Sequence, residues 1–64
     1  MTEEYRGRLL AAAPVKTAGG RWAVSVRIDG RGFYADDGIA YILREEAEKE
    51  CINLGKNLVN RGLA

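Results

Sequence analysis

The last third of the chain, from Arg44 to Arg61, carries the sequence pattern that most constrains the fold. On a helical wheel its apolar side chains fall within one sector, and its lysines and asparagines fall opposite. A helix with one apolar face has to cover an apolar surface, and a short chain with one helix can offer only a small sheet for this. The sector that we predict to be buried consists of Ala47, Cys51, Leu54, Gly55 and Leu58, with Ile52 and Val59 on its flank.

The sequence also marks both ends of this helix. Glutamates crowd its first turns from Arg44, where the helix dipole favours acidic side chains. Arg61 lies in the predicted last turn, and Gly62 directly after it suits a helix C-cap. Isoleucine and tyrosine favour an extended chain in residues 38–43, and an early helix start there is the alternative that the sequence leaves open.

Two paired strands are predicted before the helix. From Arg21 to Asp29 apolar and polar residues alternate, so one face of this strand should be buried and the other wet. Asp29-Gly30 is a strong signal for a two-residue hairpin, so a third strand should follow and pair with this one. The register of the third strand decides whether Phe33 or Tyr34 points inward, and the sequence does not fix it. The predicted inward residues of the strand before the turn are Trp22, Val24, Val26 and Ile28.

A first strand is predicted from Tyr5 to Ala13. Pro14 follows it and cannot donate a ladder hydrogen bond, which favours an edge position. Residues 15–20 contain two glycines and predict the turn that leads to the next strand. Strand alternation would place Tyr5, Leu9, Ala11 and Ala13 on one face, with Arg6 and Arg8 on the other.

Together these segments predict a single α+β domain over residues 1–64, a three-stranded antiparallel β-meander with one C-terminal α-helix packed on one face. Gly55 in the buried sector predicts a close approach of helix and sheet over a bulky residue such as Trp22, because a helix glycine costs about 1 kcal/mol relative to alanine. The second face of the sheet would be bare. A domain of 64 residues buries only about 60% of the surface of its unfolded chain, so dimerisation would supplement its stability.

The sequence offers little for catalysis. It has one cysteine, Cys51, and no histidine, so it lacks an internal disulfide and the usual metal and nucleophile constellations. The DDG triplet at residues 36–38 lacks the ligand spacing of a calcium loop and is typical of a turn. We therefore expect no enzyme activity, metal, cofactor or small-molecule substrate. The acidic N-terminus and the absence of a long apolar run predict a cytoplasmic chain without a signal peptide or membrane span.

The charge distribution indicates one candidate binding surface. Residues 1–34 contain six basic and three acidic side chains, whereas residues 35–50 are mainly acidic. Strand alternation collects several arginines on the bare sheet face beside an aromatic ring, and sheet modules hold single-stranded nucleic acid with such an arrangement. A solvated outer face of mixed charge is the alternative. The candidate residues are Arg6, Arg8, Arg21, Ser25, Arg27 and Tyr34.

The segment FYADDGIAY followed by EEAEKECINLGKNLV resembles a loose group of small bacterial βββα domains. In that group a strand that ends in an aromatic residue precedes an EEA helix start, and a Leu-Gly-Lys lies midway along the helix. The resemblance covers about residues 20–62 and implies a double-stranded-RNA-binding fold that lacks its first helix. The sequence is also similar to the sheet plus helix of HicB-type antitoxins. The matching residues are Tyr41, Glu45, Glu46, Ala47, Leu54, Gly55 and Lys56.

These observations predict a non-enzymatic interaction module. The bare sheet face, or the edge of an outer strand, would bind another protein or a second copy, so we expect a homo-oligomer or a protein partner. Nucleic-acid binding through the basic sheet face is the alternative.

Overall fold

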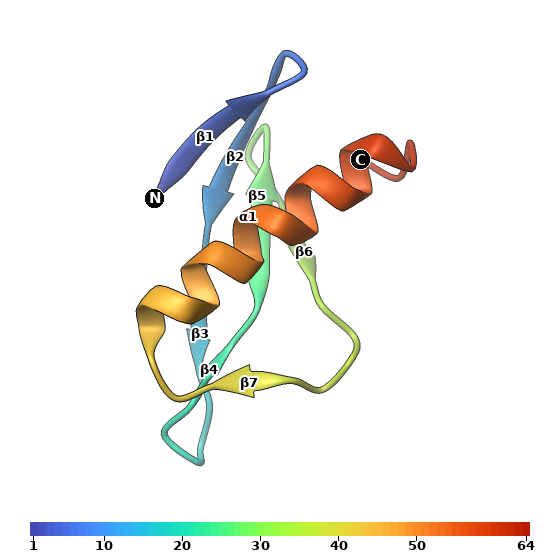
Figure 1. The fold of residues 1–64 in the computed structure, drawn as a ribbon. Helices are drawn as coiled ribbons and strands as arrows, with labels where there is room; N and C mark the ends of the chain where they lie inside the picture. The colour runs from blue at the N-terminus through green and yellow to red at the C-terminus, as the bar shows by residue number, and fades with distance from the viewer.

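The computed structural model describes residues 1–64 and has an α+β fold with one helix and antiparallel strands. The helix lies across one face of the strands, and no element covers the opposite face (Figure 1). The predicted α+β class is confirmed. The predicted three-stranded meander is wrong, because seven strands form two sheets, one four-stranded and one three-stranded. The elements are β1 (Thr2–Tyr5), β2 (Arg8–Ala12), β3 (Val15–Lys16), β4 (Trp22–Ala23), β5 (Ser25–Ile28), β6 (Arg31–Tyr34), β7 (Ala40–Tyr41) and α1 (Arg44–Asn60).

The chain begins with a hairpin and not with the single strand predicted from Tyr5 to Ala13. β1 and β2 pair across a two-residue turn at Arg6-Gly7, with Tyr5 opposite Arg8. Arg6 has a φ of 51° and Gly7 a φ of 76°, as a type I′ turn requires. Arginine is uncommon at positive φ, so this turn lacks the Asn-Gly or Asp-Gly signal by which a sequence usually marks it.

The side chains of β2 alternate in the opposite sense to the prediction. Leu10 is fully buried in the core beneath α1, whereas Leu9 is 53% exposed on the uncovered face. Ala11 lies on the same side as Leu9, because alternate residues of a strand share a face. The pairing of Leu10 with Ile28 sets this register, and the local sequence does not distinguish two adjacent leucines.

β2 and β3 together pair with β4 and β5 as one long hairpin. Leu10 lies opposite Ile28 near one end, and Val15 lies opposite Ala23 near the other. These two pairs belong to one register with no residue inserted between them. The alternation of faces therefore continues from the first sheet into the second.

The long hairpin reaches further than predicted. Lys16 still pairs with Trp22, so the turn occupies residues 17–21 and not residues 15–20. The edge position predicted for the first strand is wrong for β2, which lies between β1 and β5. Pro14 lies between β2 and β3, and only the short β3 after it is an edge strand.

The third predicted strand is present as two pieces, β6 and β7. The predicted hairpin at Asp29-Gly30 is confirmed, with φ values of 50° and 86° and with β6 paired to β5. In this register Phe33 lies opposite Val26 on the helix side, which places Tyr34 on the uncovered face.

Residues 36–39 leave the sheet between β6 and β7. Pairing stops at Ala35, whose N–H donates to the Val24 carbonyl oxygen at 3.1 Å, and resumes where Ala40 lies opposite Ala23. The helix starts only after β7, which confirms the predicted extended chain before it.

The helix α1 begins at Arg44, as predicted, and ends in the expected glycine cap. Gly62 has a φ of 70°, and its N–H donates to the Val59 carbonyl oxygen at 3.1 Å. The N–H of Leu63 donates to the Leu58 carbonyl oxygen at 2.9 Å. This Schellman arrangement satisfies carbonyl groups that a helix end otherwise leaves without partners.

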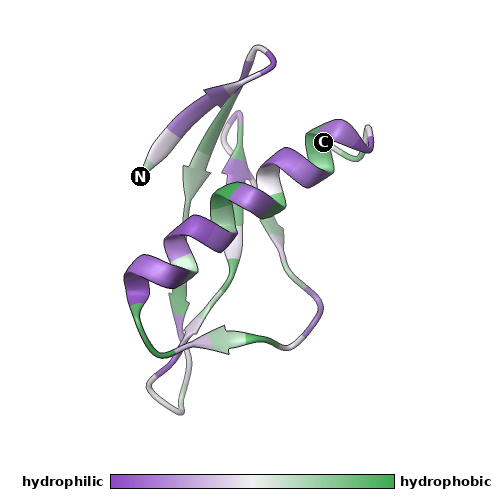
Figure 2. Cartoon of the chain, viewed as in Figure 1, coloured by the Kyte–Doolittle hydropathy of each residue, from purple (hydrophilic) through white to green (hydrophobic).

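The core is a thin layer between α1 and the helix side of the strands. Leu54 and Leu58 are half-buried at its border. Apolar segments recur along α1 between hydrophilic ones (Figure 2), as expected for a helix with one buried face. The buried residues are Leu10, Val24, Ser25, Val26, Ile28, Ala47, Cys51, Ile52 and Gly55.

Trp22 was predicted in this core but lies outside the buried cluster. Its half-buried ring lies beside the start of α1, with Arg44 5.2 Å and Lys16 5.8 Å from the ring centroid. The helix crosses the strands at an angle, and the cationic side chains of Arg44 and Lys16 lie over the ring.

Gly55 brings α1 close to the sheet over Leu10 and Val26, and not over Trp22 as predicted. A Cβ atom on Gly55 would lie 3.1 Å from Val26 Cγ2 and 3.2 Å from both Cδ atoms of Leu10. The glycine therefore lets the helix backbone rest directly on two buried side chains.

Candidate functional site

The structure separates the six residues that were predicted to bind nucleic acid. Arg8 lies on the helix side of β2, where its guanidinium donates to the Asp29 carboxylate and, at 2.6 Å, to the Ala64 carbonyl oxygen. The Asp29 carboxylate also accepts the N–H of Leu9 at 3.0 Å. The hydrogen bond from Leu9, and then that from Arg8, hold the pKa of Asp29 below its ordinary value. Arg8 thus joins the β5–β6 turn to the end of the chain.

Of three more, two lie at turns, and Ser25 shares the face of Tyr34 but is buried against the neighbouring strand. Arg6 belongs to the β1–β2 turn, with its guanidinium 5.6 Å from the centroid of the Tyr5 ring. Arg21 precedes β4, at the opposite end of the long hairpin (Figure 1). Ser25 is 5% exposed, and its hydroxyl donates to the Ala13 carbonyl oxygen. These side chains do not gather into one basic surface.

Arg27 and Tyr34 remain together on the uncovered face of the sheet. Arg27 lies opposite Gly32 and Tyr34 opposite Ser25, so the two side chains are diagonal neighbours. Arg27 takes part in no ion pair, and Tyr34 is 73% exposed.

Apolar side chains make up most of this uncovered face. Leu9 is 53% and Val15 47% exposed, and alanines fill the positions between them. Figure 2 shows apolar β2 beside the hydrophilic β1 that borders it. Glu4 of β1 shares the face with Leu9, which lies opposite it, and forms no ion pair. We call this surface the open face, and its residues are Thr2, Glu4, Leu9, Ala11, Ala13, Val15, Ala23, Ser25, Arg27, Tyr34 and Ala40.

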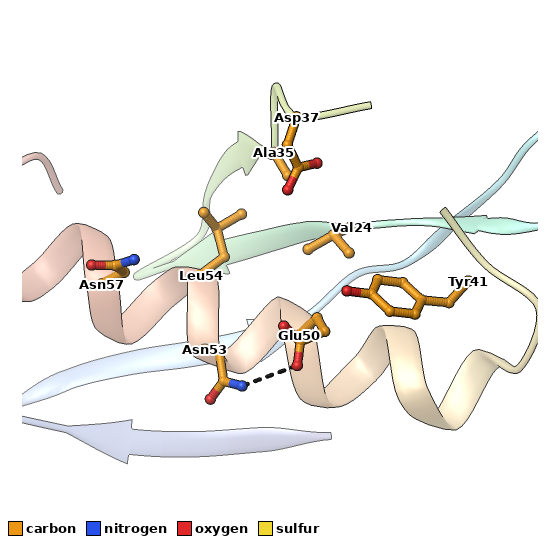
Figure 3. Close-up of a pocket in the computed structure, with 8 residues that line it drawn as sticks. All are labelled: Val24, Ala35, Asp37, Tyr41, Glu50, Asn53, Leu54 and Asn57. Carbon is orange, nitrogen blue, oxygen red and sulfur yellow. Dashed lines mark hydrogen bonds between the residues drawn. The ribbon is translucent and has the colours of Figure 1, made fainter. Parts of the chain in front are cut away.

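A cavity between α1 and the segment from the end of β6 to β7 was not predicted from the sequence. It has a volume of about 180 Å³ and lies beside residues 36–39, where the chain leaves the sheet. Both apolar and polar side chains line it (Figure 3). We call it the Tyr41 cavity, and its lining residues are Val24, Ala35, Asp37, Tyr41, Glu50, Asn53, Leu54 and Asn57.

Polar groups reach the Tyr41 cavity from a strand, a loop and the helix. Figure 3 shows the hydroxyl of Tyr41 pointing toward the helix side of the cavity, with the Asp37 carboxylate on the loop side. The Asp37 carboxylate accepts the N–H of Ile39 at 3.0 Å, and the Glu50 carboxylate accepts the side-chain amide of Asn53 at 3.2 Å. These local hydrogen bonds hold both carboxylates at the cavity.

The charged side chains that line the Tyr41 cavity are all acidic. Burial raises the pKa of the Tyr41 hydroxyl, and the negative charges of Glu50, Asp37 and Glu46 raise it further. No basic residue is among those that line the cavity. The interruption of a strand by DDG was the only sequence signal for this site, and it does not reveal that the loop faces Glu50 on the helix.

The requirements of a metal site and of a membrane-spanning helix can be compared with this fold. No three His, Cys, Asp or Glu side chains lie together as a metal site would require, and Cys51 is a free, buried thiol. The one helix is neither long enough nor apolar enough to cross a membrane. No family model, curated protein or solved structure matches the chain, so its resemblance to small bacterial βββα domains stays a prediction.

Proposed function

We propose that the chain is a non-enzymatic interaction module that pairs with a second copy of itself through the open face. The observation that carries this proposal is the exposure of Leu9, Val15 and Tyr34 on a face that no element covers. Alanines surround these side chains, so a second sheet can approach closely. Burial of apolar surface between two copies stabilises them by about 25 cal/mol per Å².

The open face carries both an acidic and a basic side chain, which favours a second copy over a partner whose surface is only positive or only negative. Arg27 lies on β5 and Glu4 on β1, and neither forms an ion pair within the chain. In a two-fold dimer the same patch of each copy meets the other, so a patch with both signs is able to complement itself.

The size of the chain gives a second reason for self-association. The molecule measures 35 × 20 × 16 Å, so an interface of standard size, about 800 Å² on each partner, would occupy the whole of its broad face. Only nine of the 64 residues are buried, which is a small core for a fold that is stable alone. A dimer would enlarge the apolar interior of the protein.

Sedimentation equilibrium over a wide range of protein concentrations tests the proposal. We expect the measured mass to rise from 7.0 kDa toward twice this value as the concentration increases. A mass that stays at 7.0 kDa even at the concentrations used for NMR would rule out self-association.

Charge substitutions locate the interface. Leu9→Glu and Tyr34→Glu should each prevent association, because each places a carboxylate in the apolar part of the open face. Leu63→Glu is the matched control, since Leu63 is 55% exposed but follows the C-terminal end of α1. Circular dichroism should be the same for all three variants. Undiminished association of both open-face variants would overturn the assignment of this face.

Nucleic-acid binding is the second candidate function, because Arg27 and Tyr34 lie together on the open face. NMR titration with short single-stranded oligonucleotides at low salt separates the two functions. Shifts at these two residues that shrink as salt is added would favour nucleic acid. We expect no such shifts, because Glu4 on the same face offsets the charge of Arg27.

A further inference from the structure

We propose that the Tyr41 cavity binds a guanidinium group such as the side chain of an arginine. The cavity lies between α1 and the helix side of the sheet, whereas the open face is on the other side. The proposal therefore does not depend on self-association through the open face.

The cavity has the size of one side-chain group. Its volume of about 180 Å³ is similar to that of the engineered core cavity of about 150 Å³ that binds benzene, but the Tyr41 cavity is open to solvent. Val24, Ala35 and Leu54 supply apolar walls against which a flat group or a methylene stem can be buried. A bare metal ion would make no use of these walls, and only two carboxylates line the cavity.

The two carboxylates at the cavity favour the binding of a cation. The carboxylates of Asp37 and Glu50 enter from the loop and from the helix, and no basic side chain lines the space. The three ion pairs of the chain involve other acids, namely Asp29, Glu48 and Glu3. Each cavity carboxylate accepts one local hydrogen bond and retains further acceptor capacity. An incoming cation would thus meet two carboxylates that no cation neutralises.

The distribution of acceptors favours a guanidinium over an ammonium. A guanidinium is a planar fork of N–H donors that reaches separate acceptors, whereas an ammonium is a compact point charge. Around this cavity the acceptors are spread over the carboxylates of Asp37 and Glu50, the hydroxyl of Tyr41 and the amides of Asn53 and Asn57. Burial has the larger effect in raising the pKa of Tyr41, and the negative charges of Glu50 and Asp37 also raise it.

NMR titration of labelled protein with Nα-acetyl-arginine amide tests the proposal. Nα-acetyl-citrulline amide is the matched control, because it has nearly the same shape without the charge. We expect the arginine compound to shift the amide signals of residues at the cavity, such as Val24, Tyr41 and Leu54. No shifts at the highest soluble concentration, or equal shifts with the citrulline compound, would overturn the proposal.

Two substitutions test the roles of the carboxylates. Asp37→Asn and Glu50→Gln each remove a charge but keep an oxygen that can accept the local hydrogen bond. Each should weaken binding of the arginine compound by about two- to fivefold, the range expected for an ion pair in contact with solvent. Glu45→Gln is the control, since Glu45 is exposed in the first turn of α1 and does not line the cavity. An equal loss in the control would mean that general surface charge, and not the cavity, attracts the cation.

A guanidinium group can come from an arginine in a peptide or from a small free compound. A tripeptide with a central arginine should bind more tightly than agmatine if the flanking backbone adds contacts outside the cavity. Tighter binding of agmatine would identify a small guanidinium compound as the source. Free arginine should bind less well than agmatine, because the acidic cavity repels its carboxylate.

Discussion

The alternation of residues along a strand does not show which of two neighbouring side chains is buried, or which of them also forms contacts with other elements. Leu9 and Leu10 are adjacent in β2, yet Leu10 is fully buried beneath α1 and Leu9 is 53% exposed. Asp29 is both a turn residue at positive φ and the acceptor for the N–H of Leu9 and the guanidinium of Arg8. At such positions a substitution can change one interaction and leave the rest of the fold in place.

The two leucines of β2 provide a matched pair for measuring the core. Leu10→Ala should lower the free energy of unfolding by about 2–5 kcal/mol, because it leaves a cavity beneath the helix. Leu9→Ala should cost less than about 1 kcal/mol in the single copy, because the side chain is largely in water. Urea unfolding at low protein concentration measures both. Equal costs would mean that Leu10 does not hold the helix to the sheet.

Asp29→Asn tests the ion pair with Arg8 through the pH dependence of stability. Because the folded state lowers the pKa of Asp29 below 3.8, its charged form stabilises the fold above that pH. This contribution is lost as the pH falls through the lower folded-state pKa. Asparagine keeps an acceptor for the N–H of Leu9 and tolerates positive φ, so the variant loses the charge and the hydrogen bond from Arg8.

We therefore expect Asp29→Asn to be less stable than the wild type at neutral pH and to lose less stability below about pH 4. Urea unfolding at a series of pH values measures this difference. Asp36→Asn is the control, because Asp36 is exposed and has no hydrogen bond or ion pair to lose. Parallel pH profiles for Asp29→Asn and the wild type would contradict the role of the Asp29 charge.

The elements of this fold depend on contacts with one another. β1 is tied to the helix by an ion pair between Glu3 and Lys56 at 2.7 Å and by a hydrogen bond from the Tyr5 hydroxyl to Asn60 at 3.0 Å. The helix in turn rests on the sheet at Gly55, directly above buried side chains. The position of α1 is therefore set by Gly55, whose lack of a side chain allows close contact with the sheet, and by the polar contacts of Lys56 and Asn60 with β1.

Gly55→Ala tests how tightly α1 rests on the sheet. Alanine in a helix is favoured over glycine by about 1 kcal/mol, so propensity alone predicts a more stable protein. The added Cβ would lie 3.1 Å from Val26 and 3.2 Å from Leu10, and such crowding in a packed core costs about 1–3 kcal/mol. We expect a net loss of stability in thermal unfolding.

A double-mutant cycle checks the cause of this loss. In a Leu10→Ala background the added methyl group has space, so Gly55→Ala should become neutral or stabilising. Additive effects of the two substitutions would contradict close packing at this point.

The whole molecule uses the two sides of its sheet differently. One side holds the thin core and the Tyr41 cavity beneath α1, and the other side presents Leu9, Val15 and Tyr34 to solvent. The guanidinium of Arg8 reaches the carbonyl oxygen of Ala64, so the first hairpin and the end of the chain are held together. The buried apolar side chains therefore lie on the helix side of the sheet, and none of them covers the open face.

Self-association should make the thermal midpoint depend on concentration. Pairing stabilises folded copies by mass action, so the midpoint of the wild type should rise with protein concentration. Tyr34→Glu should remove this rise and leave the midpoint at low concentration nearly unchanged, because Tyr34 is 73% exposed. Circular dichroism melts at several concentrations measure both effects, with Leu63→Glu as the control. A wild-type midpoint that is independent of concentration would count against the proposed dimer.

The sequence alone determined the features that depend on neighbouring residues. The start of α1 at Arg44, its cap at Gly62 and the turn at Asp29-Gly30 follow from preferences of a few consecutive residues for particular backbone angles. The alternation in the segment before that turn follows from strand geometry, which needs no knowledge of the partner strand. These local rules also predicted a sheet with one face under a helix and one face bare.

Where the local sequence allows two arrangements of a strand, only contacts with other parts of the chain decided which one forms. Leu10 and not Leu9 is buried because of its pairing with Ile28, a contact between distant parts of the chain. The turn at Arg6-Gly7 forms in spite of its sequence, because the pairing of β1 with β2 holds it. The Tyr41 cavity exists because a loop and a helix that are separate in sequence meet across the sheet. Register and packing are properties of paired segments, and so a pattern read along one segment does not contain them.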